Sequence, residues 1–145
     1  MALRAHYADE SLKQQIVNFL VAGVDSEVGR EAIDGAVADC ERMESRSRAL
    51  ASDYVIEGGV ALVKVGGSTQ PFDKTMLLLL GQEIAPVSVV VEHGNASIAA
   101  AFDSGIDFVK LLELGGGMPT RVSVPAKRLP DALAVIRQHL SERKG

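Results

Sequence analysis

The stretch from Val87 to Val124 places the tightest constraint on the fold of this 145-residue chain. It opens with two short apolar runs on either side of His93-Gly94-Asn95. These three residue types supply the positive φ angles that a tight chain reversal needs. Two antiparallel strands are therefore predicted to meet at this tripeptide.

A short helix is predicted after this hairpin, because Asp107 has the side chain of an N-cap residue. Gly115 stands where a C-terminal cap is expected, but Gly116 and Gly117 need a second reason. Backbone without Cβ atoms allows close approach by another backbone or by a ligand's phosphate. Two interpretations stay open: the glycines cap the helix and let it pack closely on the sheet, or they contact a ligand. The apolar side of the helix is formed by Phe108, Leu111, Leu112 and Leu114.

Two helices are predicted nearer the N-terminus. The first can be capped by Asp9 or Ser11 and is closed by Gly23, and its apolar residues recur at helical spacing between positions 12 and 20. The second begins at Asp25 or Ser26 and reaches Leu50. Its polar face carries charges of both signs, which is typical of a solvated surface, and a docking face is the alternative.

The remaining elements alternate between strand and helix patterns. A β-rich run at Val60–Val65 is bounded by glycines, and Asp73 is placed to cap a helix that is apolar nearly all round and ends at Gly81. Thr120–Val124 is predicted to be a strand, and Pro130 lies in the first turn of a final helix. In the strand, Arg121 points away from its apolar neighbours.

The fold class predicted from these elements is α/β. Two N-terminal helices precede a small mixed sheet of about four strands, in the order β-α-β-β-α-β-α, with packed helices. We expect residues 1–53 to form a helical segment and residues 54–145 to form the α/β domain. A length of 145 residues corresponds to about one domain and suffices for a buried core without disulfides or metals.

The chain resembles the DHH-associated C-terminal domain of the DHH phosphoesterases, which include RecJ-type exonucleases and oligoribonuclease-like phosphodiesterases. The resemblance covers roughly Gly59 to Leu140. In that family a Ser-x-Arg-Ser strand precedes the helix, and a histidine follows the glycine run; the arginine, glycines and histidine hold the substrate's phosphates and terminal nucleotide. Here the strand reads Ser97-Ile98-Ala99-Ala100-Ala101, so alanine replaces the arginine, and Met118-Pro119 replace the histidine.

The resemblance implies a substrate-binding site without catalytic residues. Further positive charge is expected nearby, although the negative end of the helix dipole opposes an anion at the glycines. The expected phosphate-binding residues are Gly115, Gly116, Gly117 and Arg121, and the nearby charges are Lys110, Lys127 and Arg128. Aromatic residues that stack on bases are scarce, with four Phe, two Tyr and no Trp. Phe102 and Phe108 are expected to be buried, and Phe72 is the expected exposed ring.

No self-contained active site is predicted. His6, His93 and His139 are scattered, no Asp-His-His sequence occurs, and nucleophile-elbow, CxxC and Rossmann motifs are absent. The single cysteine, Cys40, has the spacing of a core residue. We therefore expect no cofactor in this chain, whereas the family's separate catalytic domain binds divalent metal such as Mn.

The predicted function is non-catalytic binding of nucleic acid or of a phosphodiester end. The alternative is a degenerate domain that acts as a protein-interaction or dimerisation module, and an independent enzyme would require a metal-dependent activity that these residues do not supply. Expected partners are single-stranded nucleic acid or a short oligonucleotide, bound weakly, a DHH catalytic domain, or a second copy in a homodimer. No membrane partner is expected, and the low cysteine content favours the cytoplasm.

Overall fold

A computed structural model describes residues 14, 16–17, 27–66 and 70–144. The predicted first helix and His6 therefore lie mostly or wholly outside the described residues. The chain divides into two compact units, one made of residues 1–47 and 69–73 and the other of residues 48–68 and 74–145.

The first unit contains most of α3, which spans Glu27–Ala51 and confirms the predicted second helix. Ser47 is fully buried in this helix and donates its hydroxyl hydrogen to the Met43 carbonyl at 2.8 Å. The same oxygen accepts a 2.8 Å hydrogen bond from the Asp73 backbone N–H. Arg42 forms an ion pair with Asp39, one turn away on the same helix, whose side chain is only 13% exposed.

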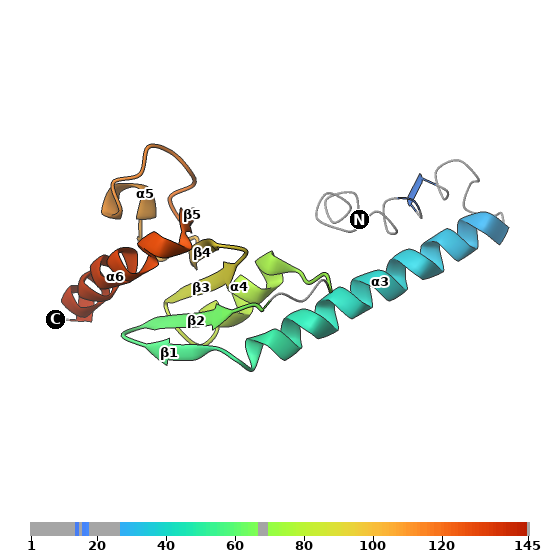
Figure 1. The fold of residues 1–145 in the computed structure, drawn as a ribbon, viewed down its shortest axis with the longest axis horizontal. Helices are drawn as coiled ribbons and strands as arrows, with labels where there is room; N and C mark the ends of the chain where they lie inside the picture. Colours follow the sequence, from blue (N-terminus) through green and yellow to red (C-terminus); the bar gives the residue numbers. More distant parts are fainter. Residues whose placement is uncertain (1–13, 15, 18–26, 67–69, 145) are drawn as a thin grey trace. The chain divides into compact units, whose positions relative to one another are not determined.

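The second unit is built on a five-stranded mixed sheet in the order β1-β2-β3-β4-β5 (Figure 1). β2 and β3 are parallel, and the other neighbouring pairs are antiparallel. The predicted mixed α/β class is confirmed, with one strand more than expected. The strands are β1 (Val55–Glu57), β2 (Val60–Lys64), β3 (Val87–Glu92), β4 (Asn95–Ala100) and β5 (Arg121–Pro125).

The additional strand, β1, pairs with β2 through a two-residue reversal. Gly58 and Gly59 have φ angles of 60° and 83°, which suit the type I′ turn that matches the twist of a hairpin. The hairpin predicted between β3 and β4 is confirmed in the same way, because His93 and Gly94 have φ angles of 49° and 77°.

Helices cover both faces of the sheet. α6 (Leu129–Lys144) and the short α5 (Phe108–Leu111) pack on one face around the fully buried Phe108 ring. α4 (Lys74–Gln82) connects β2 to β3 and packs on the other face, where the buried Ser88 hydroxyl donates to the Leu78 carbonyl at 2.8 Å. A 3-10 turn, η1 (Ala126–Arg128), joins β5 to α6. No helix in the described ranges has the length and apolarity that a membrane crossing requires.

α4 departs from the prediction at Gly81, which lies within the helix instead of ending it. A Cβ atom there would lie 2.6 Å from the Ser88 Cβ and 2.7 Å from the Tyr54 Cζ. The glycine thus lets α4 approach β3 and the Tyr54 ring closely. Although the helix is apolar nearly all round, it is not buried throughout, since Leu79 is 55% exposed.

Stability is expected to fall at high pH because of Tyr54. Its hydroxyl donates to the Leu77 carbonyl at 2.5 Å, and burial raises its pKa from 10.0 to about 12. Below pH 10 the phenol is protonated in both folded and unfolded chains, so its contribution is complete. Between about pH 10 and 12 the unfolded chain loses the proton first, and stability falls by about 1–2 kcal/mol after allowance for solvent screening.

Urea unfolding at a series of pH values measures this effect, with Tyr54→Phe as the comparison. The free energy of unfolding of Tyr54→Phe is expected to fall less steeply with pH across this window. Equal slopes for the two proteins would show that the Tyr54 phenol does not control the change.

Candidate anion-binding loop

The loop that carries the three glycines begins where α5 ends, and Glu113 determines that end. Glu113 has a φ angle of 54°, its N–H donates to the Lys110 carbonyl at 3.2 Å, and the Leu114 N–H donates to the Val109 carbonyl at 2.9 Å. This pair of hydrogen bonds is a Schellman motif. The predicted Gly115 cap is therefore wrong, whereas the predicted N-cap is confirmed: the Asp107 carboxylate accepts from the Lys110 N–H at 3.1 Å.

Gly115 and Gly116 lie in solvent with no structural need for glycine. Both are exposed, neither has a φ angle in the left-handed region, and a Cβ atom on either would meet no atom within 4 Å. Only Gly117 has a conformational reason to be glycine, with a φ angle of 121°. The interpretation that these glycines cap the helix or permit close packing is contradicted for the first two.

Arg121 is joined to this loop through its backbone. Its N–H donates to the Met118 carbonyl at 3.2 Å, just after the last glycine. Its side chain lies on the α4 face of the sheet, where Nη1 donates to the Thr75 hydroxyl at 2.8 Å. The two parts of the predicted site are thus adjacent along the chain, with the guanidinium bonded to α4.

Strand register places Arg121 directly opposite Ala99. The two residues are Cα partners in the β4–β5 ladder, so their side chains lie on the same face of the sheet. Ser97 and Ser123 form another opposed pair on that face, two residues further along. Arg121 therefore stands beside the strand position at which the family resemblance expects an arginine.

The other predicted cations are divided between two ends of the sheet. Lys110 is exposed on α5, shortly before the glycine loop. Lys127 and Arg128 follow the opposite end of β5 from Arg121, and a five-residue strand is about 16 Å long. Their predicted proximity to the glycines is therefore wrong.

An aromatic side chain that the sequence reasoning missed lies on a neighbouring loop. Phe102 was expected in the core but is 92% exposed, while Phe72 is only partly exposed. The β4–α5 loop, which carries Phe102, and the glycine loop start close together. The Ala100 N–H at the end of β4 donates to the Thr120 carbonyl just before β5 at 3.0 Å. The sequence contains one sign that Phe102 is exposed: it stands directly before Asp103-Ser104-Gly105, a composition that is typical of turns.

Metal-ligand geometry is absent from the described residues, where no three His, Cys, Asp or Glu side chains come together. His93 lies at the tip of the β3–β4 hairpin, 72% exposed, with Nε2 4.0 Å from the Glu92 carboxylate. Gly115, Gly116, Lys110 and the Phe102 ring are exposed, whereas the Arg121 guanidinium lies on the α4 face, bonded to Thr75.

Comparisons with known proteins give a likeness in fold. No protein-family model matches the chain, and no curated protein sequence matches it. A solved structure, the pGpG-specific phosphodiesterase PggH from Vibrio cholerae, matches with a TM-score of 0.56 and 10% sequence identity. The match covers 82% of this chain and 44% of that one. This chain therefore has a fold similar to that of less than half of a phosphodiesterase.

Proposed function

We propose that this chain is a substrate-binding domain of the DHH-associated type, which holds the phosphate end of a short oligonucleotide and does not cleave it. The observation that carries the proposal is the exposed pair Gly115 and Gly116, which neither packing nor backbone conformation explains. Glycine at such positions leaves the backbone N–H groups open to a phosphate. The fold shared with part of a phosphodiesterase supports the same assignment.

The proposed assignment gives Arg121 the role of the missing strand arginine. It lies on the strand next to Ala99 and on the same face, and its guanidinium donates to Thr75 through one nitrogen, Nη1. The remaining guanidinium N–H groups are suited to a phosphate oxygen. Phe102 offers a flat apolar surface for one base of the oligonucleotide.

Gly116→Ala tests the proposal by separating stability from binding. The substitution is expected to raise the free energy of unfolding by about 0.4–1 kcal/mol, because alanine restricts the unfolded chain and meets no clash in the folded one. Affinity for pGpG, measured by NMR titration at low salt, is expected to fall about five- to tenfold, because the added methyl group hinders a phosphate from reaching the backbone N–H groups.

Gly66→Ala is the matched control, since Gly66 is also exposed, outside the left-handed region and free of neighbours within 4 Å of a Cβ atom. It is expected to gain similar stability and to keep full affinity. Unchanged affinity in Gly116→Ala, together with a dimeric chain in light scattering, would favour the dimerisation module instead. Hydrolysis of pGpG by the purified chain with Mn²⁺ would contradict the non-catalytic assignment.

A further inference from the structure

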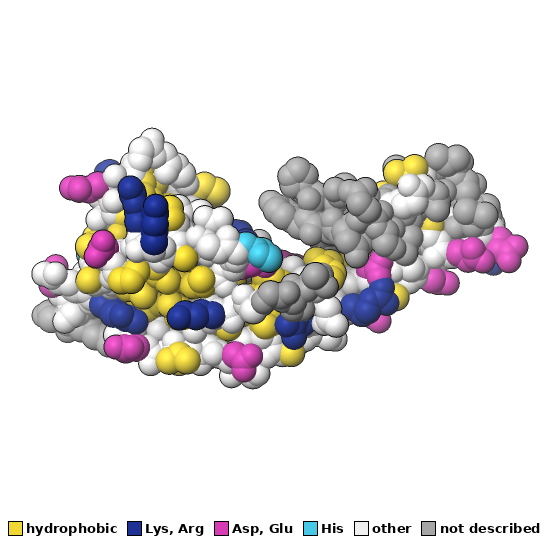
Figure 2. Space-filling view, in the orientation of Figure 1, with side chains coloured by type: hydrophobic (Ala, Val, Ile, Leu, Met, Phe, Trp, Pro, Cys, Tyr) yellow, Lys and Arg dark blue, Asp and Glu magenta, His cyan; other side chains and the backbone are white. Residues whose placement is uncertain are grey.

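A groove of about 480 Å³ lies between α6 and the β1–β2 edge of the sheet, away from the glycine loop. Figure 2 shows a hydrophobic patch over β2 and α6, with Lys and Arg side chains along its border. The groove is lined by Val55, Glu57, Leu62, Lys64, Val91, Ala126, Leu129, Pro130, Leu133 and Arg137.

The floor of the groove is a part of the sheet that α6 leaves uncovered. Val55 and Leu62 are Cα partners, so they lie on one face, and Val55 is 65% exposed. The wall comes from one stripe of α6, because Leu129, Leu133 and Arg137 are spaced four residues apart. The apolar floor and the apolar wall thus both come from regular elements, the sheet and α6.

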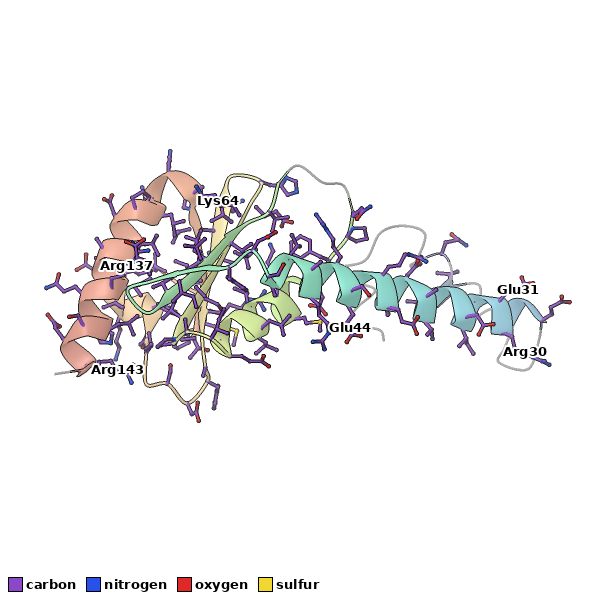
Figure 3. All side chains as sticks on the ribbon, turned by 90° about the horizontal axis from the view of Figure 1, so that it is seen from below. Arg30, Glu31, Glu44, Lys64, Arg137 and Arg143 are labelled. Atoms are coloured by element: carbon purple, nitrogen blue, oxygen red, sulfur yellow. The ribbon has the colours of Figure 1, made fainter. Side chains whose placement is uncertain are left out.

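Two cationic side chains, Lys64 of β2 and Arg137 of α6, line the groove. Lys64 ends β2 and lies on the same face as Leu62, since side chains two residues apart along a strand share a face. Within the described residues no carboxylate comes within 4.0 Å of its ammonium group. Figure 3 shows Lys64 on β2 and Arg137 on α6.

Arg137 is held in place by the β1–β2 hairpin. Its Nε donates to the Glu57 carbonyl at 3.2 Å, and its Nη2 lies 3.8 Å from the Glu57 carboxylate. A Cβ atom on Gly58 would lie 2.9 Å from the Arg137 Cδ, so the glycine leaves room for this side chain. Arg137 is therefore positioned before any ligand binds, and Lys64 supplies the charge that no described carboxylate neutralises.

We propose that this groove binds a small anionic amphiphile, with its apolar ring or chain on Leu62 and Leu133 and its acidic group at Lys64. The volume lies in the range of about 300–1,000 Å³ that is typical of small-ligand sites. Such sites are mostly apolar with a few fixed polar groups, which is the composition found here. An uncharged apolar molecule would make no ion pair with the Lys64 ammonium group. The acidic group therefore distinguishes the proposed ligands from uncharged apolar molecules.

Two fluorescent probes with the same ring system test the proposal: 8-anilinonaphthalene-1-sulfonate, which is anionic, and N-phenyl-1-naphthylamine, which is neutral. The folded chain is expected to bind the anionic probe more tightly, with amide shifts at Leu62, Val91 and Leu133. In Lys64→Gln the affinity for the anionic probe is expected to fall about fivefold, as for loss of one partly exposed charge contact, with no change for the neutral probe.

Lys127→Gln is the matched control, because Lys127 is exposed on η1 next to the groove but does not line it. It is expected to leave both affinities unchanged. If Lys64→Gln and Lys127→Gln lost equal affinity for the anionic probe, the net charge of the chain would explain the effect, and the proposal would be overturned. Amide shifts confined to other parts of the chain, or equal affinities for the two probes, would also overturn it.

Discussion

Arg121→Ala is expected to lower the affinity for pGpG by about 10- to 100-fold, since a charge-assisted hydrogen bond contributes about 1.5–3 kcal/mol. The folded state is expected to lose little, because the bond from Arg121 to the Thr75 hydroxyl is exposed and accounts for about 0.5–1 kcal/mol. The dissociation constant is measured by NMR titration at several salt concentrations. Removal of one phosphate contact should also reduce the slope of log affinity against log salt by about 0.7.

Two further variants test whether affinity depends on the guanidinium geometry, on a charge at position 121 or only on net charge. Arg121→Lys keeps the charge but loses the planar fork, so we expect it to recover the salt slope and only part of the affinity. Arg128→Ala removes an exposed arginine at the other end of β5 and is expected to change affinity little. If Arg121→Ala and Arg128→Ala lowered the affinity for pGpG by similar factors, net charge, and not a site beside Ala99, would attract the oligonucleotide.

Gly81→Ala is expected to destabilise the second unit by about 2–3 kcal/mol, which lowers its melting temperature by about 10 °C. The added methyl group would lie 2.6 Å from the Ser88 Cβ and 2.7 Å from the Tyr54 Cζ. Alanine's better helix propensity returns about 1 kcal/mol, so the net loss is smaller than the steric cost alone. Urea unfolding followed by circular dichroism measures the change.

Gly66→Ala serves again as the control, because the same substitution in open surroundings is expected to stabilise the chain. The burial of Tyr54 predicts a further result: displacement of the ring should expose its hydroxyl to water, which moves the Tyr54 pKa back toward 10. A Gly81→Ala protein as stable as the parent would show that α4 can move away from β3 at no cost.

Local chemistry was enough to predict the features whose cause lies within a few residues. His93-Gly94 predicted the β3–β4 reversal because a two-residue hairpin needs two positive φ angles. Asp107 predicted the start of α5 because a cap needs only its own side chain and an N–H three residues on. Alternation predicted that Arg121 and Val122 lie on opposite faces of β5.

Predictions failed where distant residues decide the outcome. α5 ends at Leu111, because the left-handed residue that closes it is Glu113 and not Gly115, and the partly buried Leu114 that follows packs against the core. Gly81 belongs inside α4 because Tyr54 and Ser88 occupy the space that a side chain would need. The same limitation explains Phe102, since its exposure depends on where the β4–α5 loop runs.

Residue patterns along the chain were enough to predict the mixed α/β class, the order of most elements and two glycines, Gly116 and Gly117, beyond the one expected to cap α5. Tertiary structure alone decided that Gly115 and Gly116 are free of packing contacts, that Arg121 lies opposite Ala99, and that β1, β2 and α6 enclose a groove. The difference lies in the sequence separation of the residues that form each feature. Turns, caps and alternation depend on bonds between near neighbours, whereas strand register and groove walls join residues that are tens of positions apart.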